Sequence, residues 1–176
     1  MFSKSLFAIM GTMAIGSVTA SPLEARAETH TVNLVNKCGS GTAKFLYQGN
    51  PTPRGSGTIN GPVNGGIAWI DGFAGADCQS SGVNCGVVEF TLTNNQGGGQ
   101  QNAADYSLLD GPGLGNHKFH YPMNFQFTGS CTKAAPGQCT GNSASQCPGA
   151  YLGSATEGGA PVQCLSDDTG ISIQFC

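Results

Sequence analysis

Residues 86–93 read Gly86-Val87-Val88-Glu89-Phe90-Thr91-Leu92-Thr93. In this stretch Val88, Phe90 and Leu92 occupy alternate positions, and Val87, Glu89 and Thr91 occupy the positions between them. Because successive side chains of a β-strand point to opposite faces, the pattern predicts a strand with one buried face. Glu89 would then lie on the face opposite Phe90 and Leu92.

Similar short stretches occur on both sides of this strand. Alternating or apolar runs are present at 31–36, 44–47, 66–70, 106–109, 121–127 and 171–175. The chain holds 28 glycines and 9 prolines, which disfavour long helices, and charged residues make up only 10% of it. This composition predicts an all-β sandwich or barrel without an internal repeat. We expect the chain to end in a hairpin, with 162–164 joined to 171–175 by the turn at 166–170.

The eight cysteines all follow residue 37, and the last of them, Cys176, ends the chain. An even number of cysteines confined to one part of a chain predicts a disulfide framework formed in an oxidising compartment. A terminal cysteine stabilises most when it is joined to a distant partner, and the most distant candidate is Cys38. Cys78 and Cys85 form a plausible local loop. The partners of the other four cysteines stay open at this point.

The first residues have the pattern of a secretory signal. Lys4 precedes an apolar run over 6–18, and small residues at 18–20 suit cleavage. We therefore expect a signal peptide at 1–20, a short leader or propeptide at 21–29 and one secreted domain at 30–176, with Ser21 or Glu28 as the mature start. No run is long enough for a membrane span, and the few cations form no basic patch, so neither a membrane nor nucleic acid is an expected partner. We expect a monomer.

In order and spacing, six pieces of the chain between Thr31 and Cys176 resemble the thaumatin-like family. They are Val35-Asn36-Lys37-Cys38, Ile67-Ala68-Trp69, Glu89-Phe90-Thr91-Leu92-Thr93-Asn94, Asp105-Tyr106-Ser107-Leu108-Leu109-Asp110-Gly111, Tyr121-Pro122-Met123-Asn124-Phe125 and Gln146-Cys147-Pro148. The chain is short for that family and most resembles its small secreted fungal members, often called glycopeptides. The resemblance implies a two-sheet β-sandwich whose disulfide-rich second domain is largely absent. It also implies the pairs Cys38–Cys176, Cys78–Cys85, Cys131–Cys164 and Cys139–Cys147.

The same resemblance implies an acidic groove that holds β-1,3-glucan. The matching positions in this chain are Glu89, Asp105 and Asp110, and we take them as candidate catalytic carboxyl groups. Glycoside hydrolysis needs one carboxyl group as acid and a second as nucleophile or base. Where the family has an arginine after the tryptophan strand, this chain has Asp71 or a near neighbour, and the family's last aspartate falls in the missing domain.

Aromatic and acidic residues near these carboxyl groups are candidates for sugar binding, namely Trp69, Asp71 and Tyr106. Tryptophan among apolar neighbours is equally typical of a core. Three functions stay open: glucan binding without turnover, slow endo-β-1,3-glucanase activity, and an effector-like action on a partner protein. A fourth interpretation gives the carboxyl groups no role beyond turns and solvated strands.

The histidines suggest no cofactor. His117 and His120 lie three residues apart after a glycine-rich loop, which predicts loop histidines and no metal site. His30 could hold copper only if processing ended at Thr29. We expect neither a metal nor a cofactor.

Overall fold

The computed structural model describes residues 27–94, 102–111, 115–153 and 159–176. The predicted signal peptide and residues 21–26 of the predicted leader lie outside these residues. Within them the regular structure is β-strand apart from one three-residue 3₁₀ turn, so the predicted all-β class is confirmed. None of the described helical residues forms a segment long and apolar enough to cross a membrane.

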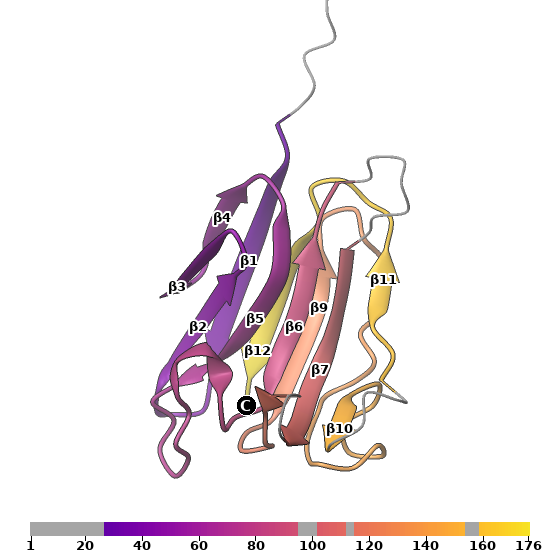
Figure 1. The fold of residues 1–176 in the computed structure, drawn as a ribbon. Helices are drawn as coiled ribbons and strands as arrows, with labels where there is room; N and C mark the ends of the chain where they lie inside the picture. The colour runs from indigo at the N-terminus through magenta and orange to yellow at the C-terminus, as the bar shows by residue number, and fades with distance from the viewer. Residues whose placement is uncertain (1–26, 95–101, 112–114, 154–158) are drawn as a thin grey trace, which may run out of the picture.

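The described strands form two sheets (Figure 1). The smaller sheet has the order β4-β1-β12-β9, and the larger has the order β10-β7-β6-β5-β2-β3, with β8 and β11 also paired to β7. The elements are β1 Thr29–Asn36, β2 Thr42–Tyr47, β3 Asn50–Arg54, β4 Gly57–Asn60, β5 Val63–Asp71, η1 Ser80–Gly82, β6 Val87–Leu92, β7 Asn102–Gly111, β8 Gly115–Asn116, β9 Met123–Thr128, β10 Tyr151–Gly153, β11 Val162–Cys164 and β12 Gly170–Phe175.

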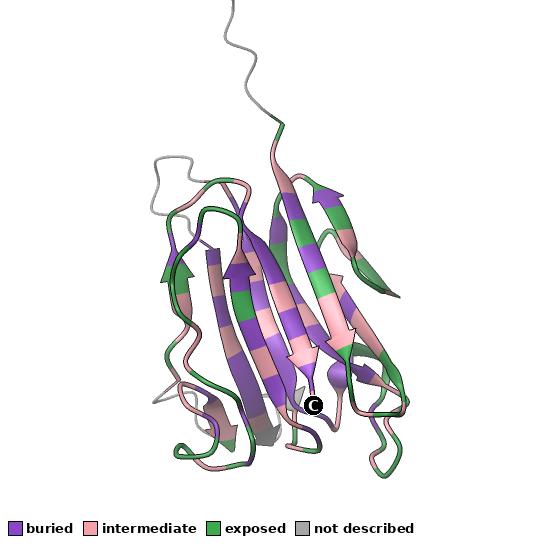
Figure 2. Ribbon diagram, turned by 180° about the vertical axis from the view of Figure 1, so that it is seen from behind, coloured by how far each residue is buried: buried purple, intermediate pink, exposed green. Residues whose placement is uncertain are grey.

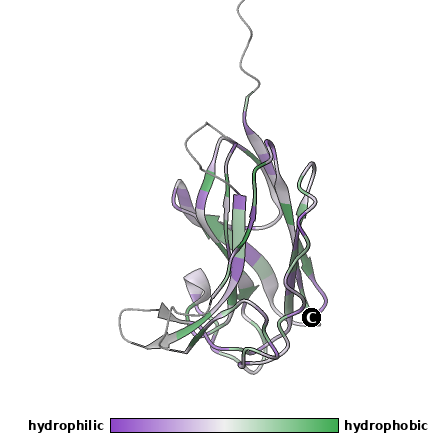
Figure 3. Ribbon diagram, turned by 90° about the vertical axis from the view of Figure 1, so that its right-hand side faces the viewer, coloured by the Kyte–Doolittle hydropathy of each residue, from purple (hydrophilic) through white to green (hydrophobic). Residues whose placement is uncertain are grey.

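The hydrophobic core lies between the two sheets. Burial alternates along the strands of the smaller sheet (Figure 2), and the side view shows two layers with hydrophobic stretches on strands of both (Figure 3). Val88, Phe90 and Leu92 of β6 are buried in this core, as their alternation predicts. Tyr121 joins the layers at one end: its hydroxyl donates to the Gly86 carbonyl and accepts from the Ile70 amide, each at 3.0 Å.

The expected C-terminal hairpin is wrong. β11 pairs antiparallel with β7 in the larger sheet, whereas β12 lies between β1 and β9 in the smaller one. The turn residues between β11 and β12 therefore carry the chain from one sheet to the other. β12 runs parallel to β1, with Val32 opposite Ile171 and Asn36 opposite Phe175, so the first and last described strands are neighbours.

The eight cysteines, all in the described residues, form four disulfides, and none is free. The pairs are Cys38–Cys176, Cys78–Cys85, Cys131–Cys164 and Cys139–Cys147, the same as those that the resemblance implies. Cys38–Cys176 spans 138 residues and lies just beyond the β1–β12 pairing. It therefore fixes the C-terminal ends of β1 and β12 to each other.

Candidate functional site

Glu89 and Asp105 meet on the outer face of the larger sheet. The antiparallel register of β6 and β7 places them directly opposite each other, and Ile67 of β5 lies opposite Glu89 on the other side. Directly opposed side chains have Cβ atoms about 4.5–5.5 Å apart, close enough for the carboxyl groups to interact. Alternation along β6 places Glu89 on this face because Val88 and Phe90 take the core side.

An open groove of about 310 Å³ lies along this carboxyl pair. Besides Glu89 and Asp105, its walls are formed by three neighbouring strands, with Gly65, Gly66, Ile67, Phe90, Thr91 and Ala103. β5 bulges between Val63 and Gly66, and Gly65 has a positive φ of 55°. A Cβ on Gly66 would lie 2.7 Å from the Phe90 ring, so glycine is required for β5 to pass this close.

The environment of Asp105 favours its protonated form. Burial is the largest cause, followed by repulsion from the negative charge of Glu89 and a hydrogen bond with the Glu89 side chain, and together they raise the pKa of Asp105 to about 7. The Asp105 Oδ1 atom is buried and has no hydrogen-bond partner among the described residues. Asp105 therefore keeps its proton up to about pH 7, so its carboxyl group offers a donor beside the acceptor oxygens of the pair.

The contact between these two groups bears on hydrolysis. In glycoside hydrolases the two carboxyl groups stand about 5 Å apart when configuration is retained and about 6.5–9.5 Å apart when it is inverted. Glu89 and Asp105 are directly opposed on neighbouring strands, where Cβ atoms lie about 4.5–5.5 Å apart, so this pairing falls short of the spacing of an inverting pair.

Asp110 is not brought to this pair. It lies five residues after Asp105 near the end of β7, which corresponds to about 17 Å along an extended strand, and its backbone pairs with Asn116 of β8. The Asp110 side chain lies outside the described residues. Asp71, at the end of β5, is opposite Thr42 and is not among the residues that form the groove.

The binding roles predicted for Trp69 and Tyr106 are wrong, because both side chains are fully buried. Tyr106 points into the core, where its ring packs at 5.0 Å from Phe125 and its hydroxyl donates to the Gly137 carbonyl at 2.7 Å. Burial raises its pKa far above the usual tyrosine value. Trp69 lies on the outer side of its sheet, but the loop closed by Cys78–Cys85 covers it. Neither ring is open to a sugar.

Gly82 allows this loop to lie close to the sheet. Its φ is +75°, and a Cβ there would come 2.5 Å from Val87 Cγ1 and 3.5 Å from the Trp69 side chain. The Trp69 Nε1 atom is buried and finds no hydrogen-bond partner in the described part of the chain. Trp69, Val87 and Gly82 thus form a small second apolar cluster outside the main core.

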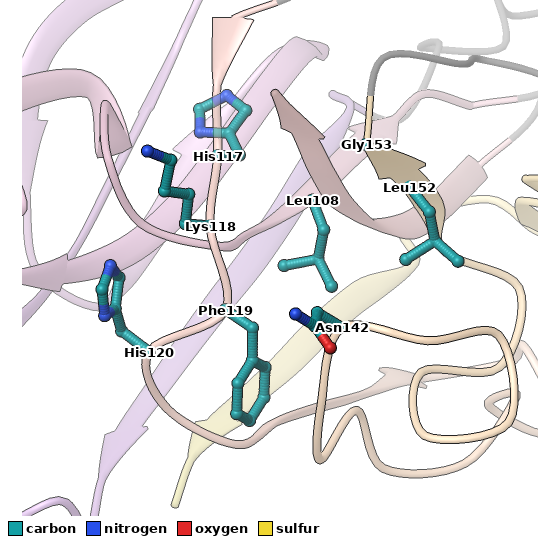
Figure 4. Close-up of a pocket in the computed structure, with 8 residues that line it drawn as sticks. All are labelled: Leu108, His117, Lys118, Phe119, His120, Asn142, Leu152 and Gly153. Carbon is teal, nitrogen blue, oxygen red and sulfur yellow. The ribbon is translucent and has the colours of Figure 1, made fainter. Parts of the chain in front are cut away.

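His117 and His120 flank a second cavity of about 360 Å³ (Figure 4). The His117 Nδ1 atom lies 3.0 Å from the carbonyls of both Gly82 and Cys85, so it carries the proton and donates. In Figure 4 the two imidazole rings do not converge on a common point, and Leu108, Phe119 and Leu152 supply the apolar side chains. The described residues include no group of three His, Cys, Asp or Glu side chains that could hold a metal.

His30 is a structural residue. It is fully buried, with Nδ1 2.7 Å from the Thr169 carbonyl and Nε2 2.9 Å from the Glu28 carboxylate. The same Glu28 oxygen accepts from the Asn94 amide at 2.7 Å. Both ring nitrogens are therefore engaged, which leaves no copper ligand at this position and ties the start of β1 to the turn before β12.

The features of the site given above are those of its geometry and its charges. Comparison of the chain with family models, with curated proteins and with solved structures finds no match.

Proposed function

We propose that this chain is a secreted, thaumatin-like protein that binds a cell-wall β-1,3-glucan in the groove beside Glu89 and Asp105, without efficient hydrolysis. The single observation that carries the proposal is the carboxyl pair itself. It lines the groove, Asp105 holds its proton up to about pH 7, and the direct cross-strand pairing of Glu89 with Asp105 falls short of the spacing of an inverting glycosidase.

The chemistry of the pair suits a neutral sugar. Sugar hydroxyls both donate and accept, and a half-protonated carboxyl pair presents acceptor oxygens together with one donor. Hydrogen bonds to charged carboxylates are stronger than those between neutral groups. Ile67 and the backbone of Gly65 and Gly66 complete a shallow, partly apolar wall against which a sugar ring can lie.

Two further features support the thaumatin-like and secreted parts of the proposal. The two-sheet architecture and the four disulfide pairs agree with what the sequence resemblance implies. Stable structural disulfides form in oxidising compartments, which fits an exported protein.

The test is retention on insoluble β-1,3-glucan. We expect the double variant Glu89→Gln/Asp105→Asn to lose retention by about tenfold, because two neutral amides remove the charge-assisted hydrogen bonds. Asp77→Asn is the matched control, since it removes an exposed carboxylate outside the groove. Retention of the double variant at the level of wild type would refute the groove as the binding site.

A separate measurement addresses turnover. Release of reducing ends from laminarin by the wild-type protein should stay at the level of Glu89→Gln. Release that depends on Glu89 would instead establish the alternative, a slow endo-β-1,3-glucanase.

A further inference from the structure

The four strands of the smaller sheet, all within the described residues, carry no charged side chains. None of the residues of β1, β4, β9 and β12, all of which are fully described, is Asp, Glu, Lys or Arg. The charged strand residues instead belong to the larger sheet, where they include Lys44, Arg54, Asp71, Glu89 and Asp105. Charge is thus segregated between the two faces of the sandwich.

Apart from Val35, which lies beside Gln174, amides and hydroxyls occupy most of the outward positions in register. Asn33, Ser172 and Gln126 form one row across β1, β12 and β9, and Thr31 pairs with Thr58 in a neighbouring row. Asn33 donates to the Ser172 hydroxyl at 3.1 Å, and the Thr31 and Thr58 hydroxyls are also 3.1 Å apart. The exposed bands of Figure 2 belong in part to this face.

The register turns these side chains into a regular array. Rows are separated by about 7 Å along the strands, and neighbours within a row by about 4.8 Å. Asn33, Gln126, Thr31 and Thr58 are exposed, whereas the residues between them, such as Val32 and Phe125, are buried in the core. The face is therefore held rigidly by the core beneath it.

The absence of charge selects a neutral partner. A charged side chain loses strong hydration when a neutral polymer covers it, and that cost is not returned. Amides and hydroxyls lose less and regain hydrogen bonds with sugar hydroxyls, since both partners donate and accept. A charged polymer or an anionic membrane would gain no electrostatic attraction from this face.

We infer that the outer face of the β4-β1-β12-β9 sheet is a second binding surface, which takes an insoluble neutral polysaccharide. This inference extends the proposed function to the opposite side of the sandwich and rests on the protein being a carbohydrate binder. With one site on each face, a single molecule can bridge two polymer chains, and simultaneous attachment raises retention without any new contact.

The test adds charge without changing shape. Asn33→Asp/Gln126→Glu places two carboxylates in the central row, and Gln138→Glu/Asn142→Asp adds the same charge at exposed positions outside this sheet and outside the groove. Retention is measured on insoluble β-1,3-glucan, cellulose and chitin, and thermal unfolding checks that each variant is folded. We expect at least about fivefold weaker retention of Asn33→Asp/Gln126→Glu on one or more of these polymers, with the control unchanged.

Particle bridging separates this inference from the proposed function. Wild-type protein should agglutinate polysaccharide particles, and the variants of either face should still bind but no longer agglutinate. Equal retention of Asn33→Asp/Gln126→Glu and its control on all three polymers would overturn the second surface. Binding in the groove is tested separately, by Glu89→Gln/Asp105→Asn alone. If retention of Asn33→Asp/Gln126→Glu and of its control falls equally, the loss is a general effect of negative charge, and this outcome would also overturn the second surface.

Discussion

At the scale of single residues, Asp105 is the group whose behaviour is most unlike that of a free side chain. Its carboxyl is partly buried, faces the Glu89 carboxylate and has one oxygen without a described partner. A neutral carboxyl group tolerates this environment better than a charged one. The protein therefore holds a proton on Asp105 under conditions in which the unfolded chain has released it.

This difference makes stability depend on pH. The pKa of Asp105 is about 7 in the folded state against 3.8 for an unperturbed aspartate, so the folded chain binds the extra proton between these two pH values. The stabilisation is complete below about pH 4 and is lost as the pH rises through about 7. We expect Asp105→Asn, which cannot ionise, to gain about 2 kcal/mol relative to wild type between pH 4 and pH 8.

Urea unfolding at several pH values measures this effect. Asp77→Asn serves as control, because Asp77 is exposed and lies outside the carboxyl pair. A difference in the free energy of unfolding between Asp105→Asn and wild type that stays constant from pH 4 to pH 8 would contradict the raised pKa of Asp105.

At the scale of elements, the loop closed by Cys78–Cys85 defines one end of the outer face of the larger sheet. It covers Trp69 and Val87, and it can approach them only because residue 82 is glycine. We expect Gly82→Ala to lower the free energy of unfolding by about 2–4 kcal/mol, through its positive φ and through the clash with Val87.

Gly72→Ala is the matched control for this prediction. Gly72 also has a positive φ, 66°, but a Cβ there would meet nothing within 4 Å. It should therefore show the backbone cost alone, about 1 kcal/mol. Equal losses in the two variants, measured by urea unfolding, would show that the loop does not pack on Trp69 as described.

The elements also show how far the sequence alone can lead. Alternation correctly places Val88, Phe90 and Leu92 inside and Glu89 outside, because period two is a local property of a strand. It does not predict that Trp69 is buried from the outer side, since the covering loop joins the sheet by tertiary packing. The same limit explains the wrong hairpin: the turn residues at 166–170 predict a change of direction but not a change of sheet.

The sequence likewise predicts only part of the candidate site. The position of Asp105 opposite Glu89 depends on the register of β6 and β7. No local sequence pattern predicts this register, and only the family resemblance placed the two residues in one site. Neither the strand patterns nor the resemblance identifies Gly65 and Gly66 as site residues, although both line the groove. Two adjacent glycines within a strand indicate a bulge or a close backbone approach, and that signal could have placed them at a groove.

At the scale of the whole molecule, the first and last described strands are joined twice, by the β1–β12 pairing and by Cys38–Cys176. Because this disulfide closes a loop of 138 residues, it limits the unfolded chain strongly. We expect Cys38→Ser/Cys176→Ser to lower the free energy of unfolding by about 3–5 kcal/mol while the fold is kept.

Chemical unfolding of this double variant gives the loss, and circular dichroism checks the fold. Cys78→Ser/Cys85→Ser is the comparison, since its loop spans only 7 residues and the loop-entropy contribution is smaller. A larger loss for the short loop would show that local packing, rather than closure of the domain, dominates.

The molecule as a whole has two outer faces. The larger sheet carries the Glu89–Asp105 pair beside a groove, and the four strands of the smaller sheet carry no charged residues. The central claim is that a neutral glucan binds at the pair. Covering the pair with sugar removes more water from it, which favours the form that holds one proton. Binding should therefore take up a proton and weaken as the pH rises through about 7.

Calorimetric titration with a soluble β-1,3-linked glucose oligomer at about pH 5 and about pH 8.5 tests this claim most directly. The account predicts at least about fivefold weaker affinity of the wild-type protein at the higher pH, and an affinity of Asp105→Asn that does not change with pH. Equal wild-type affinity at the two pH values, or the same pH dependence in Asp105→Asn, would contradict it.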